Sequence, residues 1–261
     1  FRERLVDLLK HYYVIGGMPE AVAAYAETHN FIDVLDVQKA ILSGYRNDFS
    51  KHAPKNDVPR IKMFWDAIPS QLAKGNKKFM YSGIRKGERA AAYRAPISWL
   101  SGAGLIHLCR RVTAPRLPLK SYADTAFKVY VLDVGLLSSI SGLDSRVVLD
   151  GSRVFTEFKG ALTEQYVLQQ MIAEYGDEPC YWSTDDSRTE VDFVVQNGKD
   201  VVPVEVKAEE NVQSKSLKSY MERFNPPISY RLSMRPYKEQ TIEAPGNFER
   251  TLVNVPLYGI K

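Results

Sequence analysis

Residues 188–208, RTEVDFVVQNGKDVVPVEVKA, consist of two short runs of alternating apolar and charged residues joined by Asn197-Gly198. Asn-Gly between such runs is a strong hairpin signal, because both central residues of a type I′ turn need positive φ. With these two residues as the loop, Gln196 pairs with Lys199 across the hairpin. The sequence therefore predicts two adjacent antiparallel strands in the second half of the chain.

The predicted hairpin gathers charged side chains on one face of a sheet. Because side chains alternate along a strand, the apolar face consists of Val191, Phe193, Val195, Val202, Val204 and Val206. The opposite face carries Glu190, Asp192, Glu205 and Lys207. In this register Asp192 lies opposite Pro203 and diagonal to Glu205, with backbone positions about 7–8 Å apart, and Glu190 lies directly opposite Glu205. Carboxylates this close repel one another unless a cation lies between them.

Oxygen ligands in such an array suit Mg2+, because a hard divalent cation prefers carboxylates and keeps water at its remaining positions. Glu164 is a further acidic candidate, since helical spacing places it on the apolar stripe of its predicted helix. A structural alternative stays open, in which Glu190 and Glu205 pair with Lys207 and Arg188 in a network of ion pairs of small energetic value. That alternative predicts no dependence on metal.

The rest of the chain divides into three regions. The sequence of residues 1–58 predicts a helical connector, in which Gly16-Gly17 ends one helix and Pro19 begins the next. Residues 59–148 predict three helices and two strands, 105–112 and 127–137, which is the order of a winged helix. Residues 149–261 predict an α/β core of a long helix, the hairpin and further strands around a second helix. We therefore expect an α/β protein, α+β overall.

Positive residues cluster in the predicted winged-helix region. The whole chain has a net charge of +4, which is too small to indicate nucleic-acid binding by itself. Between residues 85 and 128, however, nine Lys and Arg residues stand against Glu88 and Asp124. Such a stripe suits contact with DNA phosphates, for which the candidates are Arg85, Lys86, Arg89, Arg94, Arg110 and Arg111. The alternative is a solvated basic face that contacts another domain.

Several classes of protein are disfavoured. The scattered His residues and the two cysteines have no zinc-site spacing. The cysteines, Cys109 and Cys180, lie far apart in the sequence, which favours reduced thiols in a cytoplasmic protein over a disulfide framework. No apolar run approaches the roughly 20 residues of a membrane helix, so no membrane partner is expected. The sequence contains no G-x-x-x-x-G-K-[ST], so we do not expect this chain to bind ATP through a P-loop.

The acidic residues and the lysine together resemble a known signature. Glu164, Asp192, Glu205 and Lys207 are similar to the PD-(D/E)xK nuclease set of a helix acid, a strand Asp and Glu-x-Lys on the next strand. More widely, the chain resembles the C-terminal domain of unknown function of bacterial and archaeal AAA-type ATPases. The segments that carry this resemblance are GGMPEAV, VYVLDVGLL, GALTEQYV, EVDFVV, VPVEVKA, SLKSYMERF and VNVPLYGI.

The resemblance covers nearly the whole chain and implies a winged helix followed by a PD-(D/E)xK nuclease-like domain. It also implies a partner, the chain's own N-terminal P-loop ATPase domain, through which alone ATP would be bound. The start at Phe1 without an initiator Met is expected of a piece of a longer protein. An oligomer stays open.

The expected function is Mg2+- or Mn2+-dependent hydrolysis of phosphodiester bonds in DNA held by the winged helix. Asp192, Glu205 and the backbone carbonyl of Val206 would hold the metal ion, which activates water and polarises the phosphoryl oxygen. Lys207 would position or help deprotonate the attacking water, and Glu164 would orient the site or a second metal. The alternative is an inactive nuclease-like scaffold that binds DNA or protein and regulates the attached ATPase.

Overall fold

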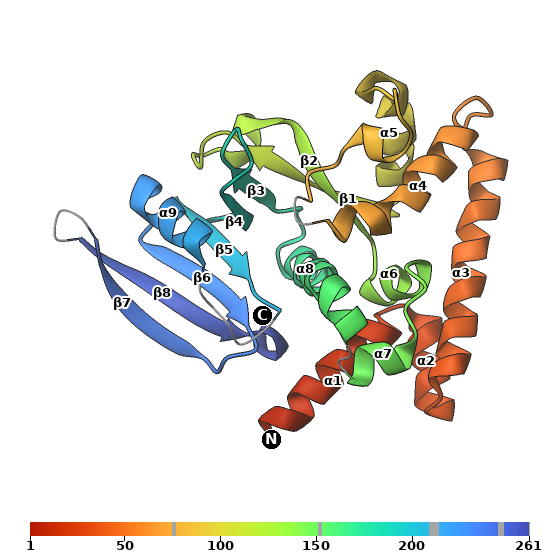
Figure 1. The fold of residues 1–261 in the computed structure, drawn as a ribbon, viewed down its shortest axis with the longest axis horizontal. Coiled ribbons are helices and arrows are strands. Elements are labelled where there is room, and N and C mark those ends of the chain that lie inside the picture. Colours follow the sequence, from red (N-terminus) through yellow and green to blue (C-terminus); the bar gives the residue numbers. More distant parts are fainter. Residues whose placement is uncertain (75–76, 151–152, 209–213, 245–247, 261) are drawn as a thin grey trace. The chain divides into compact units, whose positions relative to one another are not determined.

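The computed structural model describes residues 1–74, 77–150, 153–208, 214–244 and 248–260 (Figure 1). Its helices are α1 (Arg2–Ile15), α2 (Pro19–Thr28), α3 (Phe31–His52), α4 (Val58–Leu72), α5 (Arg94–Gly102), α6 (Val134–Ile140), α7 (Ser145–Asp150), α8 (Arg153–Tyr175) and α9 (Lys215–Phe224). Its strands are β1 (Ile106–Val112), β2 (Ala123–Val131), β3 (Cys180–Ser183), β4 (Glu190–Asn197), β5 (Asp200–Val206), β6 (Ile228–Ser233), β7 (Lys238–Ala244) and β8 (Phe248–Pro256). The chain is an α/β protein, α+β overall, as the sequence predicted.

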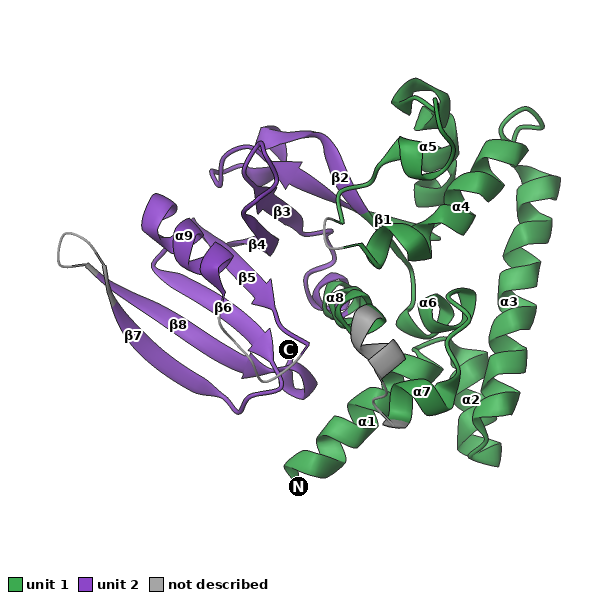
Figure 2. Cartoon of the chain, viewed as in Figure 1, with its two compact units in different colours: residues 1–108, 129–169 green, residues 109–128, 170–261 purple. Residues whose placement is uncertain are grey.

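The chain forms two compact units, coloured separately in Figure 2. The first contains residues 1–108 and 129–169, and the second contains residues 109–128 and 170–261. Strands β1 and β2 and helix α8 each run from one unit into the other. The division into 1–58, 59–148 and 149–261 stays a prediction.

The first unit is mainly helical, and its N-terminal region confirms the predicted helices. Gly16 ends α1 with a φ of 73°, which favours glycine, and Pro19 is the first residue of α2. Asn30 caps α3 by accepting a hydrogen bond from the backbone N–H of Ile32 at 3.0 Å. These local signals were sufficient to place the helix ends.

A buried carboxylate joins two distant glycine motifs in the first unit. Asp133 caps α6 by accepting from the N–H of Leu136 at 2.9 Å, and it also accepts from the N–H of Gly17 at 2.7 Å. A Cβ at Gly135 would lie 2.5 Å from the carbonyl oxygen of Ile15, so only glycine allows this approach. The prediction that residues 127–137 form one strand is therefore wrong. Strand β2 ends at Val131 and the Asp133 cap begins a helix.

The predicted winged-helix region contains fewer regular helices than expected. In the described residues between α4 and α5, the helical segments are 3₁₀ turns at Tyr81–Gly83 and Ala90–Tyr93. The two predicted strands form β1 and β2, which are neighbours in a larger sheet. The segment thus retains the order of helices followed by a strand pair, with a reduced middle helix.

The second unit is built on most of an eight-stranded mixed sheet of order β2-β1-β3-β4-β5-β6-β8-β7. Strand β1 is parallel to β3, and β5, β6 and β8 are parallel to one another. The pairs β3/β4, β4/β5 and β7/β8 are antiparallel. The predicted hairpin is thus the β4/β5 pair near the middle of the sheet.

The hairpin is present, but its predicted register is wrong by two residues. Phe193 pairs with Val204 and Asn197 pairs with Asp200, so the loop residues are Gly198 and Lys199. Of these two, Gly198 alone has a positive φ, at 60°, as a type II′ turn requires. Continued by one residue beyond Phe193, this pairing places Asp192 opposite Glu205, closer than the predicted diagonal.

The predicted alternation of β4 is also interrupted. Cys180 pairs with Val194 but Trp182 pairs with Val191, which marks a bulge in β4. Because a bulge adds one residue to a strand, Val191 and Val194 join the same apolar cluster, together with Tyr220 of α9. The prediction that Val191 shares a face with Phe193 and Val195 is therefore wrong.

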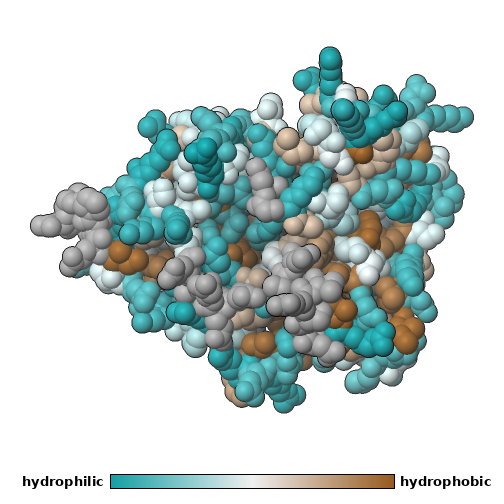
Figure 3. Space-filling view, in the orientation of Figure 1, coloured by the Kyte–Doolittle hydropathy of each residue, from teal (hydrophilic) through white to brown (hydrophobic). Residues whose placement is uncertain are grey.

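The surface is mixed in character. On the face drawn in Figure 3, hydrophilic residues are interspersed with smaller groups of hydrophobic residues. Among the described residues, every helix is too short or too polar to traverse a lipid bilayer.

Candidate functional site

Strands β4 and β5 bring the predicted Asp and the Glu-x-Lys motif together in the second unit. The backbone N–H of Val206 donates a hydrogen bond to Asp192 Oδ2 at 2.8 Å. The Asp192 carboxylate therefore lies against β5 at the residue that follows Glu205. The bulge in β4 accounts for this geometry, because it turns Asp192 out of the regular ladder.

Glu205 is the most buried carboxylate of this group, with 3% of its surface exposed. Its Oε1 atom accepts a hydrogen bond from Ser214 Oγ at 2.8 Å and lies 2.8 Å from Lys207 Nζ. Its Oε2 atom is buried and has no hydrogen-bond partner among the described residues. Ser214 also caps α9 by accepting from the N–H of Leu217 at 3.1 Å, so the start of α9 fixes this carboxylate.

Lys128 of β2 is a member of the group that the motif analysis missed. Its side chain has 0% exposure, and its Nζ atom lies 2.5 Å from Glu190 Oε1 and 3.8 Å from Asp192 Oδ1. The ammonium also lies 4.9 Å from the centre of the Tyr181 ring. Burial, and then the nearby Glu190 carboxylate, raise the pKa of Tyr181 and keep its hydroxyl neutral. A lysine within the apolar run FKVYVL is the signal that could have identified this position.

A third basic side chain comes from β6. Arg231 is paired with Glu205 across the parallel β5/β6 strands. Burial lowers the pKa of Arg231, Arg235 acts in the same direction, and Glu205 opposes them. The carboxylates Glu190, Asp192 and Glu205 are therefore accompanied by the three basic side chains of Lys128, Lys207 and Arg231.

Glu164 belongs to the first unit, whereas Asp192, Glu205 and Lys207 belong to the second. It is 6% exposed, which agrees with its predicted place on the apolar stripe of α8. Its carboxylate forms an ion pair with Lys77 and accepts a hydrogen bond from Tyr130 Oη at 3.1 Å. These contacts hold the Glu164 carboxylate within the first unit, and its role in orienting the site or a second metal stays a prediction.

The donor set allows a direct test of whether Mg2+ fits. Across the part of the chain that the structure describes, no group of three or more His, Cys, Asp or Glu side chains is arranged as a metal site. Mg2+ is commonly bound by one or two carboxylates and completes its shell with water and substrate phosphate. Asp192 and Glu205 supply two carboxylates on adjacent strands, and Glu205 Oε2 accepts no hydrogen bond from any residue that the structure describes. Two carboxylates on adjacent strands suit Mg2+, and binding of Mg2+ by Asp192 and Glu205, with the Val206 carbonyl as a third ligand, stays a prediction.

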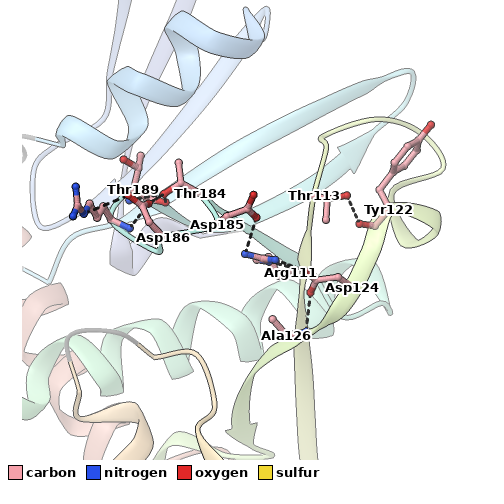
Figure 4. Close-up of polar contacts among 10 residues, drawn as sticks. Arg111, Thr113, Tyr122, Asp124, Ala126, Thr184, Asp185, Asp186 and Thr189 are labelled. Carbon is pink, nitrogen blue, oxygen red and sulfur yellow. Dashed lines mark hydrogen bonds and ion pairs between the residues drawn. The ribbon is translucent and has the colours of Figure 1, made fainter.

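The predicted phosphate contacts differ in accessibility. Arg85, Lys86 and Arg89 are exposed in the loop between the two 3₁₀ segments of the first unit, and Arg94 is exposed at the start of α5. Arg110 of β1 is exposed in the second unit. Arg111 is different, because its Nε atom donates to Asp124 Oδ2 at 2.7 Å and a second nitrogen lies 3.5 Å from Asp185 (Figure 4). Its guanidinium is thus already held by two carboxylates.

The loop between β3 and β4 is tightly hydrogen-bonded (Figure 4). The N–H of Thr184 donates to the carbonyl of Thr189 at 2.9 Å, and the N–H of Thr189 donates to Thr184 Oγ1 at 3.1 Å. The Thr184 hydroxyl also donates to Asp186, which lowers the pKa of that carboxyl. This loop fixes the start of β4 immediately before Glu190.

Comparison with protein families gives two matches. Residues 159–255, which contain the acidic group of β4 and β5, match a domain of unknown function, DUF4143. Residues 6–147 match a second domain of unknown function, DUF8612. Searches of curated proteins and of solved structures find no match. Since the DUF8612 match covers more than half of the chain, the protein belongs to the family of that domain of unknown function.

Proposed function

We propose that this chain is a DNA-binding, Mg2+-dependent phosphodiesterase module of an AAA-type ATPase, with a PD-(D/E)xK-like site at Asp192, Glu205 and Lys207. The observation that carries the proposal is the Oε2 atom of Glu205, which is buried and has no hydrogen-bond partner in the part of the chain that the structure describes. A buried polar group without a partner costs about 1–3 kcal/mol, and more when it is charged. A bound divalent cation would remove that cost.

The neighbouring groups support the same chemistry. Bound Mg2+ supplies a polarised phosphoryl oxygen and a water of lowered pKa. Ser214 and Lys207 hold Glu205 Oε1, which leaves Oε2 as the free ligand atom. The Lys207 side chain is 31% exposed, so its ammonium is accessible to a substrate phosphate and stabilises negative charge on the phosphate oxygens.

Two observations favour DNA and an attached ATPase. The exposed cations Arg85, Lys86, Arg89 and Arg94 suit the phosphate backbone, where each neutralised phosphate releases a counterion. The DUF4143 domain is commonly associated with AAA ATPases. In this proposal α4, α5 and the β1/β2 pair act as a winged helix that binds the duplex, and the module remains joined to its ATPase domain.

Isothermal titration calorimetry with Mg2+ and Mn2+ tests the cation site. Asp192→Asn and Glu205→Gln are the informative variants, because each removes a charge and retains an oxygen to accept the hydrogen bond from Val206 or Ser214. Glu222→Gln on the exposed face of α9 is the matched control. We expect binding in the wild type and the control, and at least about tenfold weaker binding in both site variants. Equal binding by all four proteins would contradict the site.

A second candidate function is supported by Lys128. Its buried ammonium already partly neutralises Glu190 and Asp192, which favours a nuclease-like scaffold that binds DNA or protein without cleaving. In that case charge reversal at Arg89 and Arg94 abolishes DNA binding, measured by fluorescence anisotropy, and Asp192→Asn leaves it unchanged. DNA cleavage that is lost in Asp192→Asn would contradict the scaffold.

A further inference from the structure

Lys128 lies outside the Asp and Glu-x-Lys motif, yet its ammonium lies within the same acidic group. A buried lysine is costly unless carboxylates compensate its charge, and Glu190 and Asp192 do so at 2.5 Å and 3.8 Å. The side chain reaches them from β2, with the Tyr181 ring 4.9 Å from its nitrogen. The positively charged side chain of Lys128 thus lies at Asp192, the carboxylate that is proposed to bind a divalent cation.

We infer that Lys128 is a specificity-determining residue of this site, which sets its affinity for divalent cations by competing for Asp192 and by sequestering Glu190. The inference rests on the proposed cation site. Because like charges repel strongly in a partly buried setting, a divalent ion at Asp192 is destabilised by the neighbouring ammonium. Lys128 also withholds Glu190, which otherwise adds a third carboxylate to the group.

The arrangement of partners distinguishes Lys128 from Lys207. Lys207 pairs with Glu205 Oε1, and its side chain is 31% exposed. Oε2 has no hydrogen-bond partner within the described ranges. Lys128 is fully buried and close to both Glu190 and Asp192. Removal of Lys207 therefore removes a group that can contact substrate, whereas removal of Lys128 changes the charge at the ligands themselves.

The experiment is Mg2+ and Mn2+ titration by calorimetry of the whole chain and three variants. Lys128→Met removes the internal cation and keeps an apolar stem of similar length. The double variant Lys128→Met/Glu190→Gln removes the ion pair and leaves the net charge unchanged. It also protects against loss of folding, because uncharged replacement of a whole buried pair is often neutral in stability. Lys120→Met removes an exposed lysine from an ion pair with Asp177 and is the matched control.

We expect Lys128→Met and the double variant to bind the cation about tenfold more tightly than the wild type, and Lys120→Met to bind as the wild type does. Binding by Lys128→Met or by the double variant, with no binding by the wild type, supports the inference and contradicts the proposed activity of the natural chain. Wild-type binding that is unchanged or weakened in both Lys128 variants overturns the inference and leaves the cation site standing. No binding by any of the four proteins overturns both.

Discussion

The ion pair between Lys77 and Glu164 gives a quantitative test of the first unit. The side chains are 13% and 7% exposed, and Glu164 also accepts from Tyr130 Oη at 3.1 Å. Glu164→Gln retains an acceptor for Tyr130 but leaves the Lys77 ammonium without its charge partner. Removal of one member of a buried pair costs about 3–5 kcal/mol, and the residual exposure of Lys77 favours the lower end, about 3 kcal/mol.

The assay is urea unfolding followed by circular dichroism at neutral pH, with Glu164→Gln, Lys77→Met and the double variant. We expect each single change to cost about 3 kcal/mol and the double variant to cost no more than either, since the pair is removed as a unit. Lys120→Met is the exposed control, and we expect it to cost below about 1 kcal/mol. A cost for Glu164→Gln as small as that of the control would refute a structural role for Glu164.

Three further outcomes follow from single contacts. Gly135→Ala forces a Cβ to within 2.5 Å of a carbonyl oxygen and should lower the free energy of unfolding by about 1–3 kcal/mol. Gly160→Ala in α8, where the nearest atom is 3.9 Å away, should be neutral or stabilising by up to about 1 kcal/mol. Thermal unfolding of the two variants measures this difference. Burial raises the pKa of Asp133 in the folded protein above its value in the unfolded chain. The protonated carboxyl therefore contributes stability that is fully present below the unfolded pKa. This contribution is lost as the pH rises through the folded pKa. Urea unfolding from pH 3 upwards should show this fall in the wild type relative to Asp133→Asn, and parallel curves would contradict it. Arg111→Gln should lower the free energy of unfolding by about 2 kcal/mol, because two carboxylates hold that side chain. Arg110→Gln on the exposed face of β1 should change it by less than about 0.5 kcal/mol. Equal effects would contradict a structural role for the Arg111 ion pairs.

Local signals in the sequence predicted the helices and the hairpin well. The Gly16 stop, Pro19 and the amphipathic run of α3 act within a few residues, so tertiary packing did not change them. The β4/β5 hairpin was also predicted from its alternation. Its turn was not, because Asn-Gly permits more than one turn type and the strand pairing selected Gly198-Lys199.

Long-range pairing accounts for what the sequence did not predict. The bulge in β4 depends on its pairing with β3, and strands β7 and β8 join the sheet through contacts with one another and with β6. Lys128 was counted as part of a basic surface, but β2 places it in the interior next to Glu190. The motif residues Asp192, Glu205 and Lys207 were predicted as a group. The position of Lys128, whose charge compensates Asp192, depends on the fold and was not predicted.

Cleavage of DNA by the whole chain is the decisive assay for a metal-dependent phosphodiesterase site at Asp192, Glu205 and Lys207. The measurement is the rate of hydrolysis of single-stranded and supercoiled double-stranded DNA with Mg2+ or Mn2+, compared with EDTA, for the wild type, Glu205→Gln and Glu222→Gln. We expect cleavage that requires the divalent cation, is lost in Glu205→Gln and persists in Glu222→Gln. Cleavage that is absent from the wild type, or equal in Glu205→Gln, would contradict it.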